Sequence, residues 1–199
     1  MQTWLKLSRA IDALNERIGG LIYWLVLVAV LISAGNAVVR KSFSISSNAM
    51  LEVQWYLFSA VFLLGAGYTF LKNAHVRIDF LSNRFSPRTR NWIDIIGMLV
   101  FLVPLCLIFI KLSWPLFVNA WESGEMSQNA GGLIRWPAYV LVPAGFSLLL
   151  LQSVSELVKR VAFLRGLGPD PLAQHPHGKE SDIEYEIEEH AAHAKEELR

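Results

Sequence analysis

The chain has 199 residues, 53% hydrophobic and 18% charged, a composition that is typical of membrane proteins and excludes an ordinary soluble globular domain. The net charge of +1 conceals an asymmetry, because residues 1–165 hold 15 Lys/Arg against 8 Asp/Glu while residues 166–199 hold 3 against 9. A basic body with apolar segments favours contact with anionic phospholipids and gives no indication of nucleic-acid binding.

Residues 1–18 predict an amphipathic helix that lies on the inner surface of the membrane. Apolar side chains recur there at 3-4-3-4 spacing, and the charged side chains lie away from that stripe. The stripe consists of Trp4, Leu7, Ile11, Leu14 and Ile18. Trp4 is the expected lipid-interface residue of this segment, and a cytoplasmic helix packed on a partner protein is the alternative.

Four segments are long and apolar enough to cross about 30 Å of hydrocarbon as helices. They are expected at about residues 19–39, 51–71, 92–118 and 136–158, within a membrane domain of residues 19–165. The predicted fold class is therefore an all-α membrane protein with four transmembrane helices. The third span reaches residue 118 if Lys111 snorkels. The aromatic residues expected at its interfaces and at the start of the fourth span are Trp92, Trp114 and Trp136.

Small and polar residues within the first two spans predict close helix contacts. Gly65 and Gly67 lie in the second span, and Asn36 lies near the end of the first. Small side chains let membrane helices approach closely, and an amide can hydrogen-bond across the contact. Packing within this chain and packing against a partner subunit both remain open.

The loop between the second and third spans predicts a short interfacial helix. Ile78, Leu81 and Phe85 fall on one side of a helix, which Pro87 would end. Basic side chains on the same segment are placed to meet lipid phosphates. These are Arg77, Arg84 and Arg88.

Basic residues segregate to one side of the four spans, which predicts that both termini are cytoplasmic in a multi-pass protein of the bacterial inner membrane. Eleven Lys and Arg lie in residues 1–18, in the loop between the second and third spans and at the start of the tail. The opposite side has only Arg40, Lys41 and Arg135, with Lys111 near the end of the third span. Residues 166–199, rich in Pro and Gly at first and acidic later, are expected to be a mostly disordered tail.

Motifs of catalysis or cofactor binding are not found in the sequence. The five histidines lie outside the predicted spans, where they could not ligate a membrane haem. Cys106 is a single cysteine with no neighbouring base. The ionisable residues Glu52, Asp94, Lys111 and Glu156 are all expected toward the ends of spans rather than at mid-membrane depth. The sequence therefore predicts a non-enzymatic protein with no substrate site, metal site or cofactor of its own.

The stretch VVRKSF…SSNAMLEVQWYLFSAVFLLGAGYTFLKNAHVRIDFL resembles the small, DctQ-like membrane subunit of tripartite ATP-independent periplasmic (TRAP) transporters. The resemblance rests on the order of four features. An Arg ends one span, a Glu opens the next, a Gly follows within that helix, and a His-x-Arg-x-Asp segment comes after it. The matching residues are Arg40, Glu52, Gly65, His75, Arg77 and Asp79. WESGEMSQNAGGLIRWPAYVLVPAGFSLLLLQ resembles the end of that subunit, and the similarity covers roughly residues 10–160.

The resemblance implies a transporter of three parts that imports an organic anion, commonly a carboxylate, with a sodium gradient. A periplasmic binding protein would capture the substrate, and a large membrane subunit would bind substrate and sodium while this chain forms part of a fixed scaffold. Arg40 and Glu52 are expected to pair at the outer interface, and the His75–Asp79 segment to hold position at the inner one. A small multidrug-type transporter would need a carboxylate in the first span, which residues 19–39 lack. A membrane anchor or assembly subunit of another complex is the remaining alternative.

Overall fold

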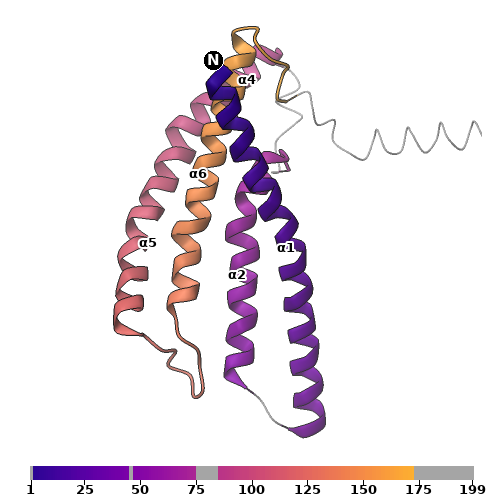
Figure 1. The fold of residues 1–199 in the computed structure, drawn as a ribbon, viewed down its shortest axis with the longest axis vertical. Coiled ribbons are helices and arrows are strands. Elements are labelled where there is room, and N and C mark those ends of the chain that lie inside the picture. The colour runs from indigo at the N-terminus through magenta and orange to yellow at the C-terminus, as the bar shows by residue number, and fades with distance from the viewer. Residues whose placement is uncertain (1, 45–46, 75–84, 173–199) are drawn as a thin grey trace, which may run out of the picture.

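The computed structural model describes residues 2–44, 47–74 and 85–172 and shows an all-helical chain across these ranges (Figure 1). Four helical segments are long and apolar enough to cross a membrane, as the sequence predicts. The elements are α1 (Gln2–Phe43), α2 (Asn48–Leu71), α4 (Pro87–Gly97), the π-helical turn η1 (Met98–Leu102), α5 (Val103–Ser123) and α6 (Trp136–Leu164). The third membrane segment runs through α4, η1 and α5 as Pro87–Ser123.

The two ends of the molecule differ in what they carry (Figure 1). We call the end at which α1 begins and α6 ends the terminal end. The opposite end, at which α1 ends and α2 begins and where residues 124–135 join α5 to α6, is called the loop end. In the half near the loop end the helices lie in one row, in the order α5, α6, α2, α1. Toward the terminal end α1 crosses over to contact α6 as well as α2. The result is a single layer of helices that closes into a three-helix contact at one end only.

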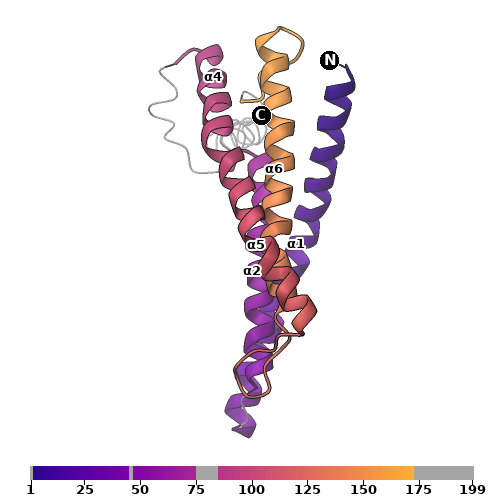
Figure 2. The same ribbon diagram turned by 90° about the vertical axis from the view of Figure 1, so that its left-hand side faces the viewer.

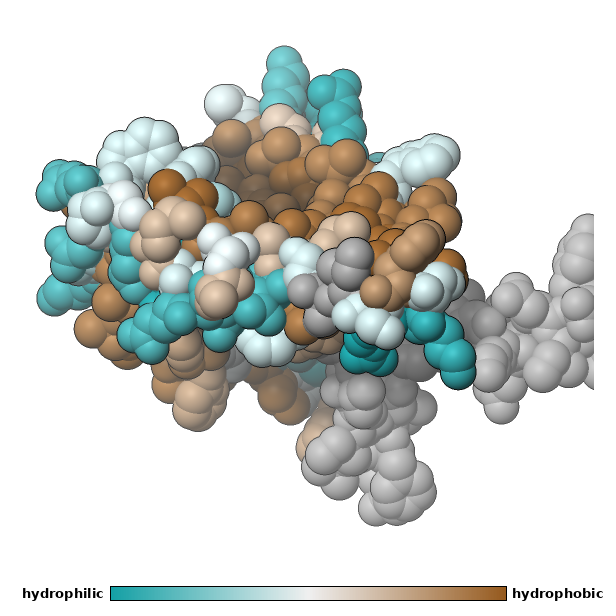
Figure 3. All heavy atoms as spheres, turned by 90° about the horizontal axis from the view of Figure 1, so that it is seen from below, coloured by the Kyte–Doolittle hydropathy of each residue, from teal (hydrophilic) through white to brown (hydrophobic). Residues whose placement is uncertain are grey.

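Most apolar side chains of this layer are exposed. The first two spans are 6% buried in their most apolar windows, and even α6 reaches only 33%. Seen from the loop end, apolar side chains extend on both sides of a band of polar residues (Figure 3). Such surfaces are suited to lipid or to another membrane helix, because lipid tails are as apolar as the side chains themselves.

Glycine allows the close approach of the two central helices. An added Cβ on Gly145 of α6 would lie 2.6 Å from the carbonyl oxygen of Leu63 on α2. On the other side of α2, Gly67 lies against the side chain of Asn15, and Gly65 faces Ile22 of α1. Gly65 and Gly67 therefore serve contacts within this chain.

The N-terminal segment differs from its prediction. It is helical, but α1 continues through residue 18 without a break, so the interfacial helix and the first span form one element. The side that faces α2 and α6 buries Ser8, Ile11 and Asn15. Trp4 and Leu7 remain exposed on the other side. Of the predicted apolar stripe only Ile11 is buried, because polar residues of α1 have polar partners on α6.

The segment before the third span also differs. Pro87 begins α4 rather than ending a helix, since a proline without an N–H fits the first helical turn. Ser86 caps this helix by accepting a hydrogen bond from the backbone N–H of Thr89. Further along, η1 precedes Pro104, and its wide turn accommodates the proline ring. The predicted interfacial helix falls largely in residues 75–84, outside the described ranges.

Candidate functional site

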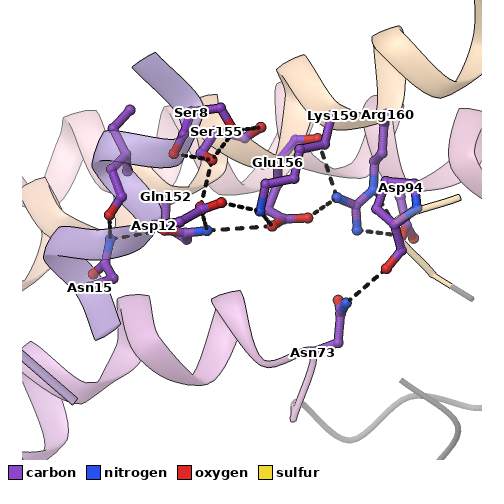
Figure 4. Close-up of polar contacts among 12 residues, drawn as sticks. Ser8, Asp12, Asn15, Asn73, Asp94, Gln152, Ser155, Glu156, Lys159 and Arg160 are labelled. Atoms are coloured by element: carbon purple, nitrogen blue, oxygen red, sulfur yellow. Dashed lines mark hydrogen bonds and ion pairs between the residues drawn. The ribbon is translucent and has the colours of Figure 1, made fainter. Parts of the chain in front are cut away.

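Polar side chains from three helices meet at the terminal end (Figure 4). This group, the terminal network, joins α1 to α6 and α6 to α4. Its members are Ser8, Asp12, Asn15, Asp94, Gln152, Ser155, Glu156, Lys159 and Arg160. Matching periodicity brings them together, since residues 8, 12 and 15 of α1 and residues 152, 156 and 159 of α6 share i, i+4, i+7 spacing.

Two adjacent cations of α6 organise the charges of the terminal network. The Lys159 ammonium lies 2.8 Å from Asp12 of α1 and 2.7 Å from Glu156. The Arg160 guanidinium pairs with Glu156 on its own helix and lies 3.1 Å from Asp94 of α4. The side chains of Arg160 and Glu156 are only 1% and 2% exposed. A continuous chain of opposite charges therefore crosses from α1 through α6 to α4.

Amides and hydroxyls complete the contact between α1 and α6. Asn15 donates its amide hydrogen to the Gln152 side-chain oxygen at 2.9 Å, and Gln152 donates to Asp12 at 2.9 Å. Ser155 donates to Asp12 at 2.7 Å, and its hydroxyl lies 2.7 Å from that of Ser8. Asp12 therefore accepts two hydrogen bonds from α6 in addition to its ion pair with Lys159, and these contacts compensate for its removal from water.

A pocket of about 260 Å³ adjoins the terminal network between α1, α2 and the segment after α6. Lys72 and Glu16 form an ion pair of 2.7 Å at this pocket. The hydrogen bond to Glu16 raises the pKa of Lys72 above its usual value. The lining residues are Asp12, Glu16, Leu71, Lys72, Asn73, Glu156, Lys159 and Pro171. The basic groups of this lining are paired with its acidic groups, so the pocket has little charge left for an ionic ligand.

The segment after α6 folds back over the terminal end. Asn91 of α4 donates to Asp170 at 2.9 Å, and Asp170 also accepts from the backbone N–H of Leu172 at 3.0 Å. The side chain of Asn73 reaches the Pro171 carbonyl at 3.5 Å. Residues 166–172, predicted as the start of the disordered tail, thus tie α6 to α2 and α4.

At the loop end, Glu52 of α2 holds the segment between α5 and α6. Its carboxylate accepts hydrogen bonds from the Ser127 hydroxyl, from the Asn129 amide at 2.8 Å and from the backbone N–H of Leu133 at 2.7 Å. Nearby, Arg135 pairs with Glu125 at 2.8 Å, a hydrogen bond that raises the pKa of Arg135. Glu52 is buried and has three donors, so it positions this loop.

Arg40 is not the partner of Glu52. Arg40 is exposed in the last turn of α1, and no ion pair joins it to Glu52 among the described residues. The predicted pairing assumed that the turn between α1 and α2 would bring the two charges together. The loop between α5 and α6 instead supplies all the donors, and a contact over more than 70 residues leaves no local sequence signal.

Replacing Glu52 by alanine is expected to release the loop without unfolding the helices. The backbone N–H of Leu133 would lose its acceptor, and hydrogen exchange there should accelerate roughly tenfold or more. Hydrogen–deuterium exchange on the purified chain in lipid nanodiscs measures this effect. Glu122→Ala, at an exposed position of the same end, is the matched control. Equal exchange at Leu133 in the two variants would contradict the role assigned to Glu52.

The remaining predicted site residues are scattered over the structure. Asn36 is buried in α1. Trp136 lies against Trp121, with ring centroids 4.7 Å apart, whereas Trp4, Trp92 and Trp114 are exposed. Arg88 is exposed in the first turn of α4. His75, Arg77, Asp79 and Arg84 lie outside the described residues.

Lys111 lies within the third membrane segment, Pro87–Ser123, twelve residues from Ser123. Two residues earlier, Phe109 of α5 stacks on Phe146 of α6, with ring centroids 4.5 Å apart. At 1.5 Å per residue, Lys111 is about 3 Å along the helix from the level of this stack. That this lysine lies near the end of the span in the membrane stays a prediction.

Three hydroxyl groups within the spans are directed to their own helices. Thr69 donates to Gly65, Ser113 to Phe109 and Ser147 to Pro143, in each case to the carbonyl four residues earlier. This back-bonding leaves no hydroxyl cluster directed into a shared cavity. Within the described ranges, no group of three or more His, Cys, Asp or Glu is arranged to hold a metal ion. The arrangement supports positioning of helices and a loop rather than chemistry.

Comparison with known proteins gives one family. Residues 29–163 match the family described as tripartite ATP-independent periplasmic transporters, DctQ component. No curated protein and no solved structure matched the chain. The matched range covers more than half of the chain and includes α2, the third span, the loop held by Glu52 and most of α6.

Proposed function

Because this chain belongs to the DctQ component family of the tripartite ATP-independent periplasmic transporters, we propose that it is the scaffold subunit of an organic-anion importer. Membership makes it a transporter subunit that works with a large membrane subunit and a periplasmic binding protein. In the proposed system the binding protein delivers an organic anion, commonly a carboxylate. The large subunit carries that anion and sodium, and this chain carries neither.

The observation that supports a scaffold role is the location of polar groups. Moving an anion across hydrocarbon requires polar side chains that converge at depth, and such groups are retained where they are used. Here the charged and amide groups with partners gather at the two ends, in the terminal network and around Glu52. Between these ends the hydroxyls of Thr69, Ser113 and Ser147 bond to their own helices. This distribution is suited to a part that holds still while a neighbouring subunit moves.

Transport should require this chain together with its large partner. Purified with the large subunit in proteoliposomes under an inward sodium gradient, it should restore uptake that also depends on the binding protein. The chain alone should give no uptake above that of empty liposomes, because its described spans offer no converging polar site. Radiolabelled substrate accumulation measures both conditions.

Two results would overturn this proposal. Uptake by the chain alone would show that it carries substrate, and full activity of the large subunit without it would show that no scaffold is needed. Co-purification with an unrelated membrane complex, in place of a large transporter subunit, would support the anchor alternative.

The proposed orientation places the terminal end in the cytoplasm, in accordance with the basic residues of that end. A membrane-impermeant thiol reagent applied to intact spheroplasts should label Glu122→Cys at the loop end. It should not label Arg88→Cys or Arg165→Cys until the membrane is opened. All three positions are exposed, so labelling depends only on the side of the membrane on which each lies. Labelling of Arg88→Cys in intact spheroplasts would show the opposite orientation. In this orientation the exposed Trp4 and Leu7 lie at the inner leaflet with its anionic lipids.

A further inference from the structure

A lysine is exposed within the third membrane segment, on α5. Lys111 lies twelve residues from Ser123, at which this segment ends, and twenty-four from Pro87, at which it begins. At 1.5 Å per residue the nearer end is about 18 Å away along the helix. An extended lysine side chain reaches only about 6 Å from its Cα, given C–C bonds of about 1.5 Å. Snorkelling along the helix would therefore cover only part of the distance to the end of the segment.

The outer face of α5, defined here by Leu107, Lys111 and Pro115, is the side opposite α6. The residues that α5 buries lie half a turn away from Lys111. They are Cys106, Ser113 and Ala120. α5 is the edge of the layer and has its extensive helix contact with α6 alone. Figure 2 looks onto this edge and shows α5 in front, uncovered by the other described helices.

Pro115 leaves a backbone carbonyl without its helical hydrogen bond on the same face of α5. A proline has no N–H, so the helical hydrogen bond that the Lys111 carbonyl would accept from residue 115 is missing. The chain accommodates Pro104 differently, with η1, where Val103 donates to the carbonyl of Met98 five residues earlier. No π-helical turn accompanies Pro115, which lies within α-helix. In membranes, carbonyls freed by proline are commonly satisfied by neighbouring helices.

We infer that the outer face of α5 is the surface that docks on the large subunit, and that Lys111 pairs there with a carboxylate on one of that subunit's membrane helices. The inference rests on the proposed function and adds to it the surface of contact and the residue that forms the ion pair. A charged side chain at this depth normally faces protein and has a partner. No acidic group pairs with Lys111 among the described residues, whereas the other exposed side chains around it are apolar. These are Leu107, Ile108, Leu112 and Trp114.

Lipid is a poorer occupant of this surface than a protein helix. Acyl chains offer neither an acceptor for the ammonium nor a donor for the freed carbonyl. A membrane helix that carries a carboxylate, with a hydroxyl or amide donor beside it, satisfies both groups at once. The partner is therefore expected to carry an acidic residue at the depth where the stacked pair of Phe109 and Phe146 lies.

The test uses the complete complex of this chain with its large subunit in lipid nanodiscs. Lys111→Met should weaken the affinity between the subunits about three- to thirtyfold, the range expected for one interhelical polar contact in a membrane. The thermal stability of the isolated variant should be equal to or above that of the wild type, since Lys111 has no partner in the described chain. Lys41→Met, at an exposed lysine in the last turn of α1, is the control and should change neither quantity.

Photo-crosslinking identifies the occupant directly. A photoreactive amino acid at Leu107 should form adducts with the large subunit, and one at Leu31 of α1, on the opposite edge of the layer, should not. Adducts from Leu31 alone, or adducts with lipid alone from Leu107, would overturn the docking surface while the proposed function stands. Failure of the wild-type chain to bind any large subunit would overturn the proposed function and this inference together. Unchanged affinity in Lys111→Met would reject the role of the lysine.

Discussion

Replacing Arg160 by methionine should destabilise the chain by about 3–5 kcal/mol, the cost of leaving a buried charge without its partner. Arg160 is fully buried and is shared by Glu156 and Asp94. Methionine has a similar length, so the helix and the space are preserved while the charge is lost. Glu156 would keep Lys159 and the hydrogen bond from Gln152, and Asp94 would lose its ion pair with α6. The loss therefore affects two helix contacts.

Thermal unfolding of the purified variants in detergent or nanodiscs measures this effect. Arg165→Met changes the same residue type at an exposed position just after α6 and should cost less than about 0.5 kcal/mol. Adding Glu156→Gln to Arg160→Met should recover part of the loss, because the buried carboxylate that lost its arginine partner is removed as well. Equal stability of Arg160→Met and Arg165→Met would show that the charge chain does not hold the terminal end.

Replacing Gly145 should separate the two central helices. A Cβ at this position would lie 2.6 Å from the backbone carbonyl of Leu63, which cannot turn aside as a side chain would. Overpacking of this kind costs about 1–3 kcal/mol for alanine, and Gly145→Leu should cost more because further atoms enter the contact. Distances between spin labels on α2 and α6 should lengthen, and the unfolding temperature should fall.

Gly35 provides the control for that experiment. It lies in α1, and no atom lies within 4 Å of its added Cβ. Gly35→Ala should therefore show only the gain in helix propensity, up to about 1 kcal/mol of stability. A loss of stability at Gly35 as large as that at Gly145 would mean that steric contact with Leu63 is not the cause.

The number and approximate limits of the membrane segments could be predicted from the sequence because length and hydropathy are local properties. The side of α1 that packs against the other helices could not be predicted in this way. The spacing of Trp4, Leu7 and Ile11 indicates an apolar face, and in a soluble protein that face would be the buried one. In a membrane the rule weakens, since lipid accepts apolar side chains equally well. Ser8 and Asn15, with partners 147 and 137 residues away respectively, are buried instead.

The partner of Glu52 and the level of Lys111 beside α6 depend on the same kind of long-range information. The sequence indicates a role for Glu52, but its donors lie on a loop that α5 and α6 position. The level of Lys111 beside α6 follows from the register of α5 on α6, in which Phe109 stacks on Phe146. One signal was available in the sequence: the shared i, i+4, i+7 spacing of polar residues in α1 and α6 indicates that the two helices meet.

The central position of α6 has a consequence for biosynthesis. α6 is the last of the described helices to leave the ribosome, yet it contacts α1, α2, α4 and α5 and supplies both cations of the terminal network. Until it is inserted, Asp12 lacks Lys159, Asp94 lacks Arg160, and α5 lacks the helix on which it packs. A nascent chain at that stage exposes surfaces of these helices that α6 covers in the finished subunit. Insertion of α6 is therefore the step that joins the earlier helices into one unit.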